Sequence, residues 1–254
     1  MRRNDDIKGV SKMRIDKMLA NLGYGSRKEV KQLLKQGAVK VNGAQIKDAK
    51  QHIDPKQDEV GIHGEIIEYK EYIYLMMNKP NGVISATEDT MHQTVIDLLE
   101  LEDIVYSPFP VGRLDKDTEG LLLITNDGKL SHQLLSPKKH VPKTYYAIIN
   151  DRVTEADIHS FAKGVKLDDG YETKPAKLEI LKSETNSEIY LTITEGKFHQ
   201  VKRMFEAVNK KVIYLKRLTM GPLQLDDSLA LGEYRELTDE ELEELLSYDP
   251  SNEM

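Results

Sequence analysis

Segments with strand character follow one another through most of this chain of 254 residues, without a regular helix between each pair. Helices are expected only near 93–100, 128–135, 154–163, 199–208 and 238–246. Because a doubly wound fold needs a helix between successive parallel strands, this order predicts an α+β fold with a mixed, mostly antiparallel sheet. The predicted strands are 72–77, 83–86, 120–125, 144–149, 176–181, 188–194 and 211–217.

Charge divides the chain into a basic front and an acidic end, although the whole chain carries a net charge of −7. Residues 13–60 hold ten lysines and arginines against six acids, a charge of +4, whereas eight acids and no base follow Arg235. These differences indicate separate modules. The expected organisation is a frayed extension at 1–12, a small α/β module at 13–64, a linker at 65–71, a larger domain at 72–246 and an acidic tail at 247–254.

The basic front contains a helix with lysines on its outer side. Ser26 and Glu29 form an S-x-x-E capping box and Gly37 suits a helix end, so a helix is predicted from about Arg27 to Gln36. A strand entering an Asn-Gly turn follows it. Because acids do not alternate with the lysines, we expect this module to bind nucleic-acid phosphates. The expected contact residues are Arg14, Arg27, Lys28, Lys31 and Lys35.

A carboxylate lies on a glycine-bounded turn directly before the predicted strand 120–125. The turn begins with Gly112-Arg113-Leu114-Asp115 and ends at Gly120. Glycines at both ends permit backbone conformations closed to other residues, and a buried strand behind would hold the turn rigid. The same pattern also suits a surface turn with a solvated aspartate, so the turn alone leaves both interpretations open.

Two further polar segments begin predicted elements. Lys143-Thr144-Tyr145 opens a strand, where a tyrosine is usually part of the core but can face a pocket. Residues 195–205 pass from a glycine-bearing turn into a helix that carries Lys202 and Arg203. Cations in the first turn of a helix oppose its dipole, which indicates an anionic partner.

Several functional classes lack support in the sequence. The chain has no cysteine, which excludes thiol nucleophiles, disulfides and thiolate zinc sites. It also has no G-x-G-x-x-G after a strand, no P-loop and no G-x-S-x-G, so no cofactor is expected. Apolar runs are too short for a membrane span and the N-terminus is charged, so we expect a cytoplasmic protein that does not bind membranes.

Taken in order, these motifs resemble the RsuA-type pseudouridine synthases, enzymes of 16S rRNA with an N-terminal S4 RNA-binding domain. The S4 resemblance lies in residues 14–19, 25–30 and 37–43, and the synthase resemblance lies in residues 112–115, 143–145 and 199–205. The resemblance implies a catalytic domain with a central mixed sheet and flanking helices. Further family-like segments are Asn78–Val83, Ser136-Pro137 and Gly232–Leu237.

The resemblance also implies roles for individual residues. It makes Asp115 catalytic, places Tyr145 against the target base and pairs Lys202 with the aspartate. Arg203 is the second choice for this cation, and Arg113 would help to fill the gap left by a flipped-out uridine. The implied reaction breaks the N1–C1′ bond and joins C5 to C1′ without a cosubstrate, which agrees with the absence of cofactor motifs.

The implied target is one uridine of 16S rRNA, uridine 516, reached by a monomer on the RNA or on an assembling small subunit. The acidic tail supports this target, because large-subunit relatives often carry basic C-terminal extensions. Many synthases outside this subfamily have arginine where this chain has Lys202, so its pairing would be single-pronged. The alternatives are a 23S rRNA synthase of the same family and a non-catalytic S4-type RNA-binding or ribosome-assembly protein.

Two other sites have little support in the residue spacing. A metal site formed by His132, His140 and His199 would match no helix or hairpin ligand pattern, so no metal is expected. An acid pair of Asp115 and Asp117, as in glycosidases, depends on a separation across the turn that the sequence does not determine.

Overall fold

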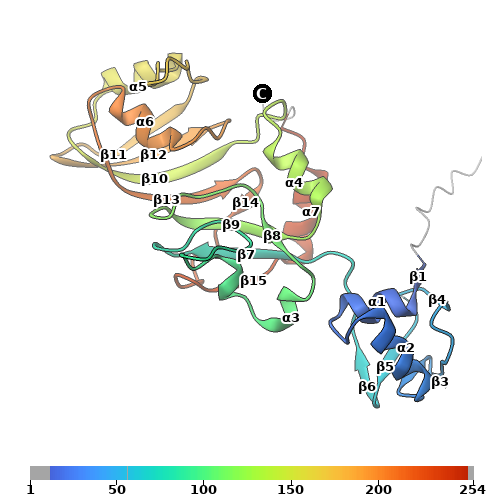
Figure 1. Cartoon of the computed structure of the whole chain (residues 1–254). Coiled ribbons are helices and arrows are strands. Elements are labelled where there is room, and N and C mark those ends of the chain that lie inside the picture. Colours follow the sequence, from blue (N-terminus) through green and yellow to red (C-terminus); the bar gives the residue numbers. More distant parts are fainter. Residues whose placement is uncertain (1–11, 56, 251–254) are drawn as a thin grey trace, which may run out of the picture. The chain divides into compact units, whose positions relative to one another are not determined.

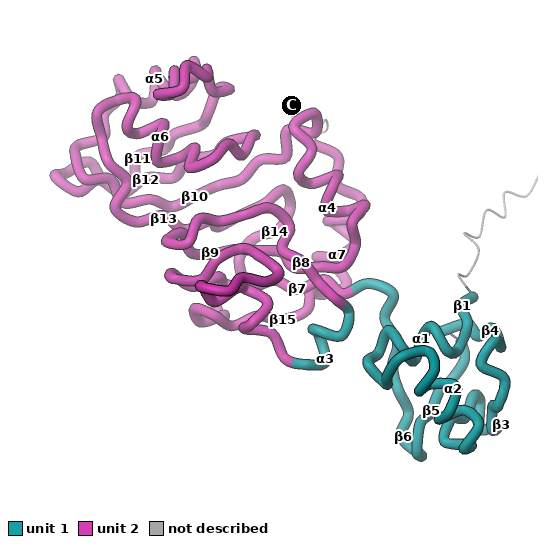
Figure 2. The backbone as a smooth tube through the Cα atoms, in the orientation of Figure 1, with its two compact units in different colours: residues 1–72, 101–106 teal, residues 73–100, 107–254 magenta. Residues whose placement is uncertain are grey.

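The computed structural model describes residues 12–55 and 57–250, which form two compact units (Figure 1, Figure 2). Unit 1 extends to Tyr72 and includes Leu101–Tyr106, whereas unit 2 consists of Ile73–Glu100 and the chain from Ser107 onward. Almost all of the extension predicted at 1–12, and residues 251–254 of the predicted tail, lie outside the described residues.

In its described residues up to Tyr72, unit 1 combines two helices with a small antiparallel sheet. The sheet has the strand order β3-β2-β5-β6, and β1 pairs separately with β4. Its core is formed by apolar side chains of both helices and of the strands, among them Leu19, Leu34 and Val39. The elements are β1 (Met13–Arg14), α1 (Ile15–Asn21), α2 (Arg27–Lys35), β2 (Val39–Val41), β3 (Ala44–Gln45), β4 (His52–Ile53), β5 (Val60–Ile62) and β6 (Glu65–Ile67).

Helix α2 follows the local signals in its sequence. The Ser26 hydroxyl accepts a hydrogen bond from the Glu29 backbone N–H, and the Glu29 carboxylate accepts one from the Ser26 backbone N–H at 2.7 Å. The predicted capping box is therefore confirmed. The predicted Asn-Gly turn is also present, with positive φ at Asn42 and Gly43 between β2 and β3.

The boundary predicted for the front module is partly wrong. Residues 65–67 were assigned to a linker but form β6, which pairs with β5. His63 and Gly64 both adopt positive φ and make a second hairpin turn, a conformation that the single glycine did not reveal. The short helix α3 (Leu101–Ile104) also belongs to unit 1 rather than to the domain predicted at 72–246.

Unit 2 is built on a mixed, mostly antiparallel sheet of nine strands in the described part of the chain. The main strand order is β11-β12-β10-β13-β9-β7-β15, and only the pairing of β13 with β9 is parallel in this sheet. The α+β prediction is confirmed. The strands are β7 (Tyr74–Lys79), β8 (Phe109–Pro110), β9 (Glu119–Thr125), β10 (Lys143–Asn150), β11 (Lys177–Lys182), β12 (Asn186–Ile193), β13 (Val212–Met220), β14 (Leu223–Gln224) and β15 (Tyr234–Glu236).

Helices pack near both ends of this sheet (Figure 1). Helices α4 (Gly128–Leu135) and α7 (Asp239–Ser247) share a buried core with side chains of β7, β9 and β13. At the other end, α5 (Glu155–Lys163) contacts α6 (Gln200–Glu206) through the rings of Phe161 and Phe205, whose centroids lie 4.9 Å apart. None of the helices in the described residues has the length and apolarity needed to cross a membrane.

Two elements predicted before the Asp115 turn are wrong. Residues 83–86 form no strand, only an isolated bridge between Ile84 and Thr94. The helix expected near 93–100 is reduced to a 3-10 turn, η1 (Ile96–Leu98). Val83 and Ser85 are buried because this segment packs inside unit 2, so the apolar residues that resembled a strand serve an irregular segment.

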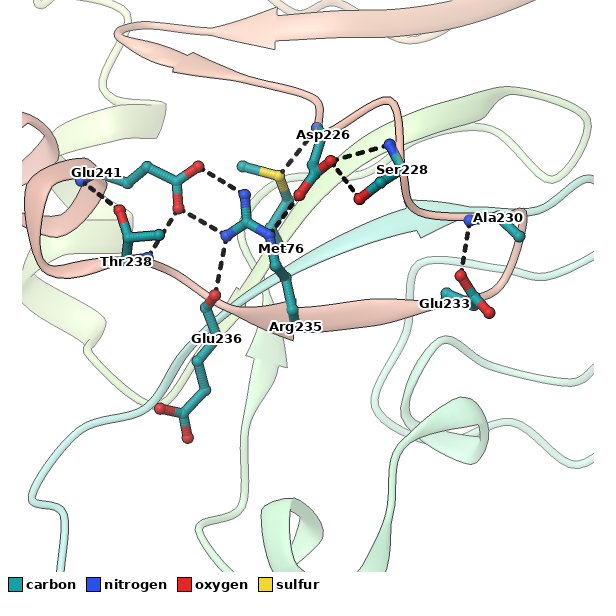
Figure 3. Close-up of polar contacts among 9 residues, drawn as sticks. All are labelled: Met76, Asp226, Ser228, Ala230, Glu233, Arg235, Glu236, Thr238 and Glu241. Carbon is teal, nitrogen blue, oxygen red and sulfur yellow. Dashed lines mark hydrogen bonds and ion pairs between the residues drawn. The ribbon is translucent and has the colours of Figure 1, made fainter.

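An arginine connects strand β15 with the start of α7 (Figure 3). Arg235 donates hydrogen bonds to Asp226 at 2.7 Å and to both carboxylate oxygens of Glu241 at 2.7 and 2.8 Å. Glu241 also completes the capping box of α7 with Thr238. Hydrogen bonds from Ser228 and Arg235 lower the pKa of Asp226 to about 2. Glu241, one of the acids that follow Arg235, thus has a structural role.

Candidate active site

Asp115 lies on the turn between β8 and β9, and the glycines at both ends adopt the predicted unusual backbone. Gly112 has a φ of +76° and Gly120 a φ of +99°. A Cβ atom at Gly120 would lie 2.2 Å from the carbonyl oxygen of Arg217 on β13, so only glycine fits this close approach. The Thr118 backbone N–H donates to the Asp115 carbonyl at 3.0 Å and closes the turn.

A buried lysine is hydrogen-bonded to the backbone of this turn. The Lys79 side chain is fully buried at the end of β7, and its ammonium donates to the carbonyl oxygens of Pro80 at 2.9 Å, Thr118 at 2.9 Å and Lys116 at 3.4 Å. Burial lowers the pKa of Lys79 to about 8, against the opposing effect of nearby carboxylates. This lysine was not among the predicted site residues, although its position directly after an apolar strand, within the family-like segment Asn78–Val83, was a usable signal.

The segment mistaken for a strand supports the turn from another side. The Ser85 hydroxyl donates to the Leu114 carbonyl at 3.1 Å and accepts from the Leu114 N–H at 3.0 Å. The Gly82 N–H donates to the carbonyl of Lys116 at 2.8 Å. The residues on both sides of Asp115 are therefore held by backbone hydrogen bonds, which fixes the direction of its side chain.

Lys202 contacts two carboxylates of the turn. Its ammonium donates to Asp115 at 2.9 Å and to Asp117 at 2.6 Å. Burial opposes the charge on Lys202, but the hydrogen bonds to the two carboxylates raise its pKa. The same contact lowers the pKa of Asp117 although burial acts in the opposite direction. Lys202 thus bridges two acids, and Asp117 was not predicted from the sequence as its second partner.

The start of α6 is fixed by a side chain that precedes Lys202. The Gln200 amide donates to the Glu195 carboxylate at 2.7 Å, and its oxygen accepts from the Lys197 N–H at 2.9 Å. His199 adopts a φ of +50°, which is uncommon for a residue with a side chain. Its Nε2 atom lies 3.6 Å from Asp115 Oδ1.

A pocket opens above these groups and contains four of the predicted residues: Arg113, Asp115, Tyr145 and Lys202. Tyr145 is buried on β10, whereas Arg113 is exposed. The apolar part of the wall includes Leu114, Ile193 and Leu215. A carboxylate whose charge is balanced by an ammonium, facing an apolar and aromatic wall, can act as a nucleophile or base on a planar group bound there.

Arg203 does not approach Asp115, so its selection as the second candidate for the cation was wrong. Its guanidinium binds Asp168 and lies 2.7 Å from the carboxylate of Asp169. These two acids raise the pKa of Arg203. Successive residues of an α-helix point about 100° apart, so when Lys202 faces the turn its neighbour must face elsewhere.

The basic face predicted in unit 1 is largely solvent-exposed. Arg14 differs from the others because it pairs with the buried Asp16 at 2.5 and 3.0 Å, which gives it a structural contact. Within the described residues, no hydrogen bond or ion pair joins Lys28, Lys31 or Lys35 to an acid, in contrast to the pairing of Arg14 with Asp16. The exposed cations of α2 are Arg27, Lys28, Lys31 and Lys35.

The histidines considered for a metal site do not form one within residues 12–55 and 57–250, where no cluster of three or more potential ligands of the His, Cys, Asp and Glu types is found. His140 contacts the ammonium of Lys174 at 2.6 Å, and His199 faces Asp115 as described above. His140 and His199 therefore have separate surroundings.

The sequence of this chain matches known proteins over most of its length. The sequence profile of the family described as RNA pseudouridylate synthase matches residues 73–207, and that of the S4 domain matches residues 13–60. The uncharacterized RNA pseudouridine synthase YtzG of Bacillus subtilis is 60% identical over 91% of this chain and 97% of its own length. Ribosomal small subunit pseudouridine synthase A of Escherichia coli is 39% identical over 91% of this chain and 98% of its own length.

A solved structure, described as the crystal structure of a pseudouridylate synthase, is 40% identical to this chain. It covers 92% of this chain and 99% of its own length, with a TM-score of 0.64. The order of the motifs, the turn that carries Asp115 and these matches lead to one conclusion. The chain belongs to the RNA pseudouridylate synthase family and carries an S4 domain at its N-terminus.

Proposed function

We propose that this enzyme converts one uridine of 16S rRNA, uridine 516, to pseudouridine, with Asp115 as the catalytic residue. The observation that carries the proposal is the 2.9 Å contact between Lys202 and Asp115 at a pocket that Tyr145 also lines.

The pocket residues have distinct roles in the proposed reaction. Tyr145 and the aliphatic wall hold the uracil, while Asp115 either attacks the nucleoside or removes a sugar proton so that the N1–C1′ bond can break. The freed uracil rotates, C5 bonds to C1′, and the proton that leaves C5 is balanced by the one that N1 gains. Lys202 balances the charge of Asp115 and, by contacting Asp117 as well, holds the turn in one position.

The uridine must leave the RNA stack before Asp115 can reach its sugar. Arg113 is exposed and lines the pocket, so it is placed to occupy the gap in the stack. The exposed cations of α2 supply phosphate contacts that do not depend on sequence, whereas Arg14 contributes mainly to the fold through Asp16.

The choice of 16S rRNA rests on the relatives. Several relatives at about 40% identity are named ribosomal small subunit pseudouridine synthase A. The proposed active form is a monomer. A cytoplasmic location follows from the proposed substrate, whether this is free rRNA or an assembling small subunit.

Mapping of pseudouridines in rRNA from cells with and without this gene tests the proposal. We expect one site to be lost, uridine 516 of 16S rRNA, and to be restored by the wild-type gene but not by a gene encoding Asp115→Asn. Loss of a site in 23S rRNA would refute the target and leave the chemistry intact. If no site is lost from any RNA, a non-catalytic RNA-binding protein becomes the better interpretation.

A further inference from the structure

One aromatic side chain beside the pocket is exposed to solvent and does not belong to the core. Phe198 is 76% exposed, more than any other Phe or Tyr side chain in the described residues. One face of its ring stacks on the imidazole of His199, with centroids 3.7 Å apart and planes 19° from parallel. The outer face of this two-ring stack is free to receive another ring.

The stack adjoins the candidate catalytic carboxylate. His199 lines the pocket, and its Nε2 atom lies 3.6 Å from Asp115. The ring of Phe198 therefore lies 3.7 Å from the ring of a residue that lines the pocket, His199. This spacing resembles the rise of about 3.4 Å between successive bases in a nucleic-acid strand. A nucleotide that flanks one bound over Asp115 would lie within reach of Phe198.

The backbone around Phe198 is organised before any ligand binds. Its carbonyl oxygen accepts a hydrogen bond from Arg203 at 3.3 Å, and the Gln200 side chain fixes the same turn. His199 is held at positive φ, a conformation that persists only where the surroundings stabilise it. Since the ring is already placed, stacking on it requires little additional ordering.

The surroundings of Phe198 favour RNA over another protein. Lys197 and Arg113 line the adjoining pocket, and Lys197 also lies over the ring of Tyr171 at 4.4 Å. An exposed aromatic ring among cations suits an unpaired base attached to phosphates, because every base has a face that can stack. We infer that Phe198, stacked on His199, binds the base of an unpaired nucleotide immediately next to the target uridine.

This inference rests on the proposed function, and it is tested with the full chain and the rRNA fragment that contains the site found by mapping. 2-Aminopurine replaces the nucleotide on either side of the target uridine in turn, because its fluorescence falls when it stacks on an aromatic ring. For the wild type and Phe198→Tyr, we expect quenching at one of the two positions. Phe198→Ala and Phe198→Leu should lose this quenching and bind the RNA about tenfold more weakly.

A second measurement distinguishes stacking from a structural effect. An abasic nucleotide at the quenched position should weaken binding by the wild type about tenfold, but should weaken binding by Phe198→Ala no further. KM should rise in Phe198→Ala while kcat at saturating RNA stays within about twofold of the wild type. Leu181→Ala removes another exposed apolar side chain, at the edge strand β11, and should leave RNA affinity and quenching unchanged.

The outcomes separate this inference from the proposed reaction. The inference would be overturned if the abasic nucleotide and Phe198→Ala each lowered RNA affinity independently, so that their effects multiplied. It would also be overturned if the fragment bound tightly without quenching at either position. Quenching that depends on Phe198 in a protein that forms no pseudouridine would support the inference and refute the reaction. Pseudouridine formation without quenching would support the reaction and refute the inference about Phe198.

Discussion

Replacement of Lys79 by methionine should separate the precision of the active site from the stability of the fold. Methionine retains an unbranched, apolar side chain of similar length but has no ammonium. The carbonyls of Pro80 and Thr118 would lose the hydrogen bonds that they accept from Lys79 at 2.9 Å. The carbonyl of Lys116 would still accept a hydrogen bond from the Gly82 N–H. The turn that carries Asp115 would then be held less firmly.

The expected change in stability is small because two effects oppose each other. Each buried carbonyl that loses its donor costs about 1–3 kcal/mol, or about 2–6 kcal/mol for two. The surroundings of Lys79 disfavour its charged form by about 3 kcal/mol in total, since its pKa falls from 10.5 to about 8 and each unit corresponds to about 1.4 kcal/mol. The free energy of unfolding should therefore change by between about +1 and −3 kcal/mol.

The expected change in catalysis is larger. A displacement of about 1 Å at a reacting group can lower the rate about 100-fold, and Asp115 is three residues from Thr118 on the same turn. We therefore expect Lys79→Met to lower kcat about 100-fold and to leave RNA affinity within about twofold. Urea unfolding measures the stability, and single-turnover formation of pseudouridine with excess enzyme measures the rate.

Lys210→Met provides a matched control. Lys210 is also largely buried, but its ammonium contacts Asp157 at 2.9 Å near the start of α5 rather than the turn. Its loss should lower stability, by about 3 kcal/mol for a broken buried pair, without lowering kcat in the folded protein. A folded Lys79→Met enzyme with kcat within about threefold of the wild type would refute the proposed role of Lys79.

The lowered pKa of Lys79 also predicts a pH dependence. Above about pH 8 the side chain loses its proton and one of its donors, so kcat should fall as the pH rises through 8, and Lys79→Met should lack this fall. The sign for stability is opposite. Because the folded-state pKa lies below the unfolded-state value of 10.5, the unfolded chain binds more protons between these values. This contribution to the free energy of unfolding therefore increases from pH 8 to pH 10.5.

Three further changes have defined outcomes. Asp226 has a pKa of about 2 in the fold against 3.8 for the model compound, so its contribution to stability should be present above pH 4 and lost as the pH falls to 2; urea unfolding of Asp226→Asn should lack this dependence. Tyr145→Phe should lower turnover more than RNA binding, and the reverse result in filter-binding and turnover assays would assign Tyr145 to the RNA backbone. Changing Lys28, Lys31 and Lys35 to Glu should lower the slope of log affinity against log salt by about 0.7–0.9 per lost phosphate contact, whereas an unchanged slope would show that these lysines are only solvated.

Local signals in the sequence were sufficient for the elements whose causes are local. The capping box of Ser26 and Glu29 correctly predicted α2, and the paired glycines at 112 and 120 correctly predicted an unusual turn around Asp115. The hairpin at His63 and Gly64 was missed because positive φ at a non-glycine residue leaves a weak trace in the sequence.

Contacts between distant residues could not be obtained in the same way. Lys202 and Asp115 are 87 positions apart, and their pairing was predicted from family resemblance rather than from residue spacing. The choice between Lys202 and Arg203 depends on the rotation of α6, which is set by packing of the whole helix. Likewise, Val83 and Ser85 were read as a strand because burial in an irregular segment and burial in a sheet give similar apolar patterns.

Single-turnover pseudouridine formation by Asp115→Asn tests the central claim most directly. The substitution retains the size of the side chain and removes the charge that Lys202 contacts. With the rRNA fragment bound to excess enzyme, we predict no detectable product by mass spectrometry and an RNA affinity within about threefold of the wild type. Product formation by Asp115→Asn at a rate near that of the wild type would contradict the account, because the carboxylate of Asp115 would then not be the group that acts on the nucleoside.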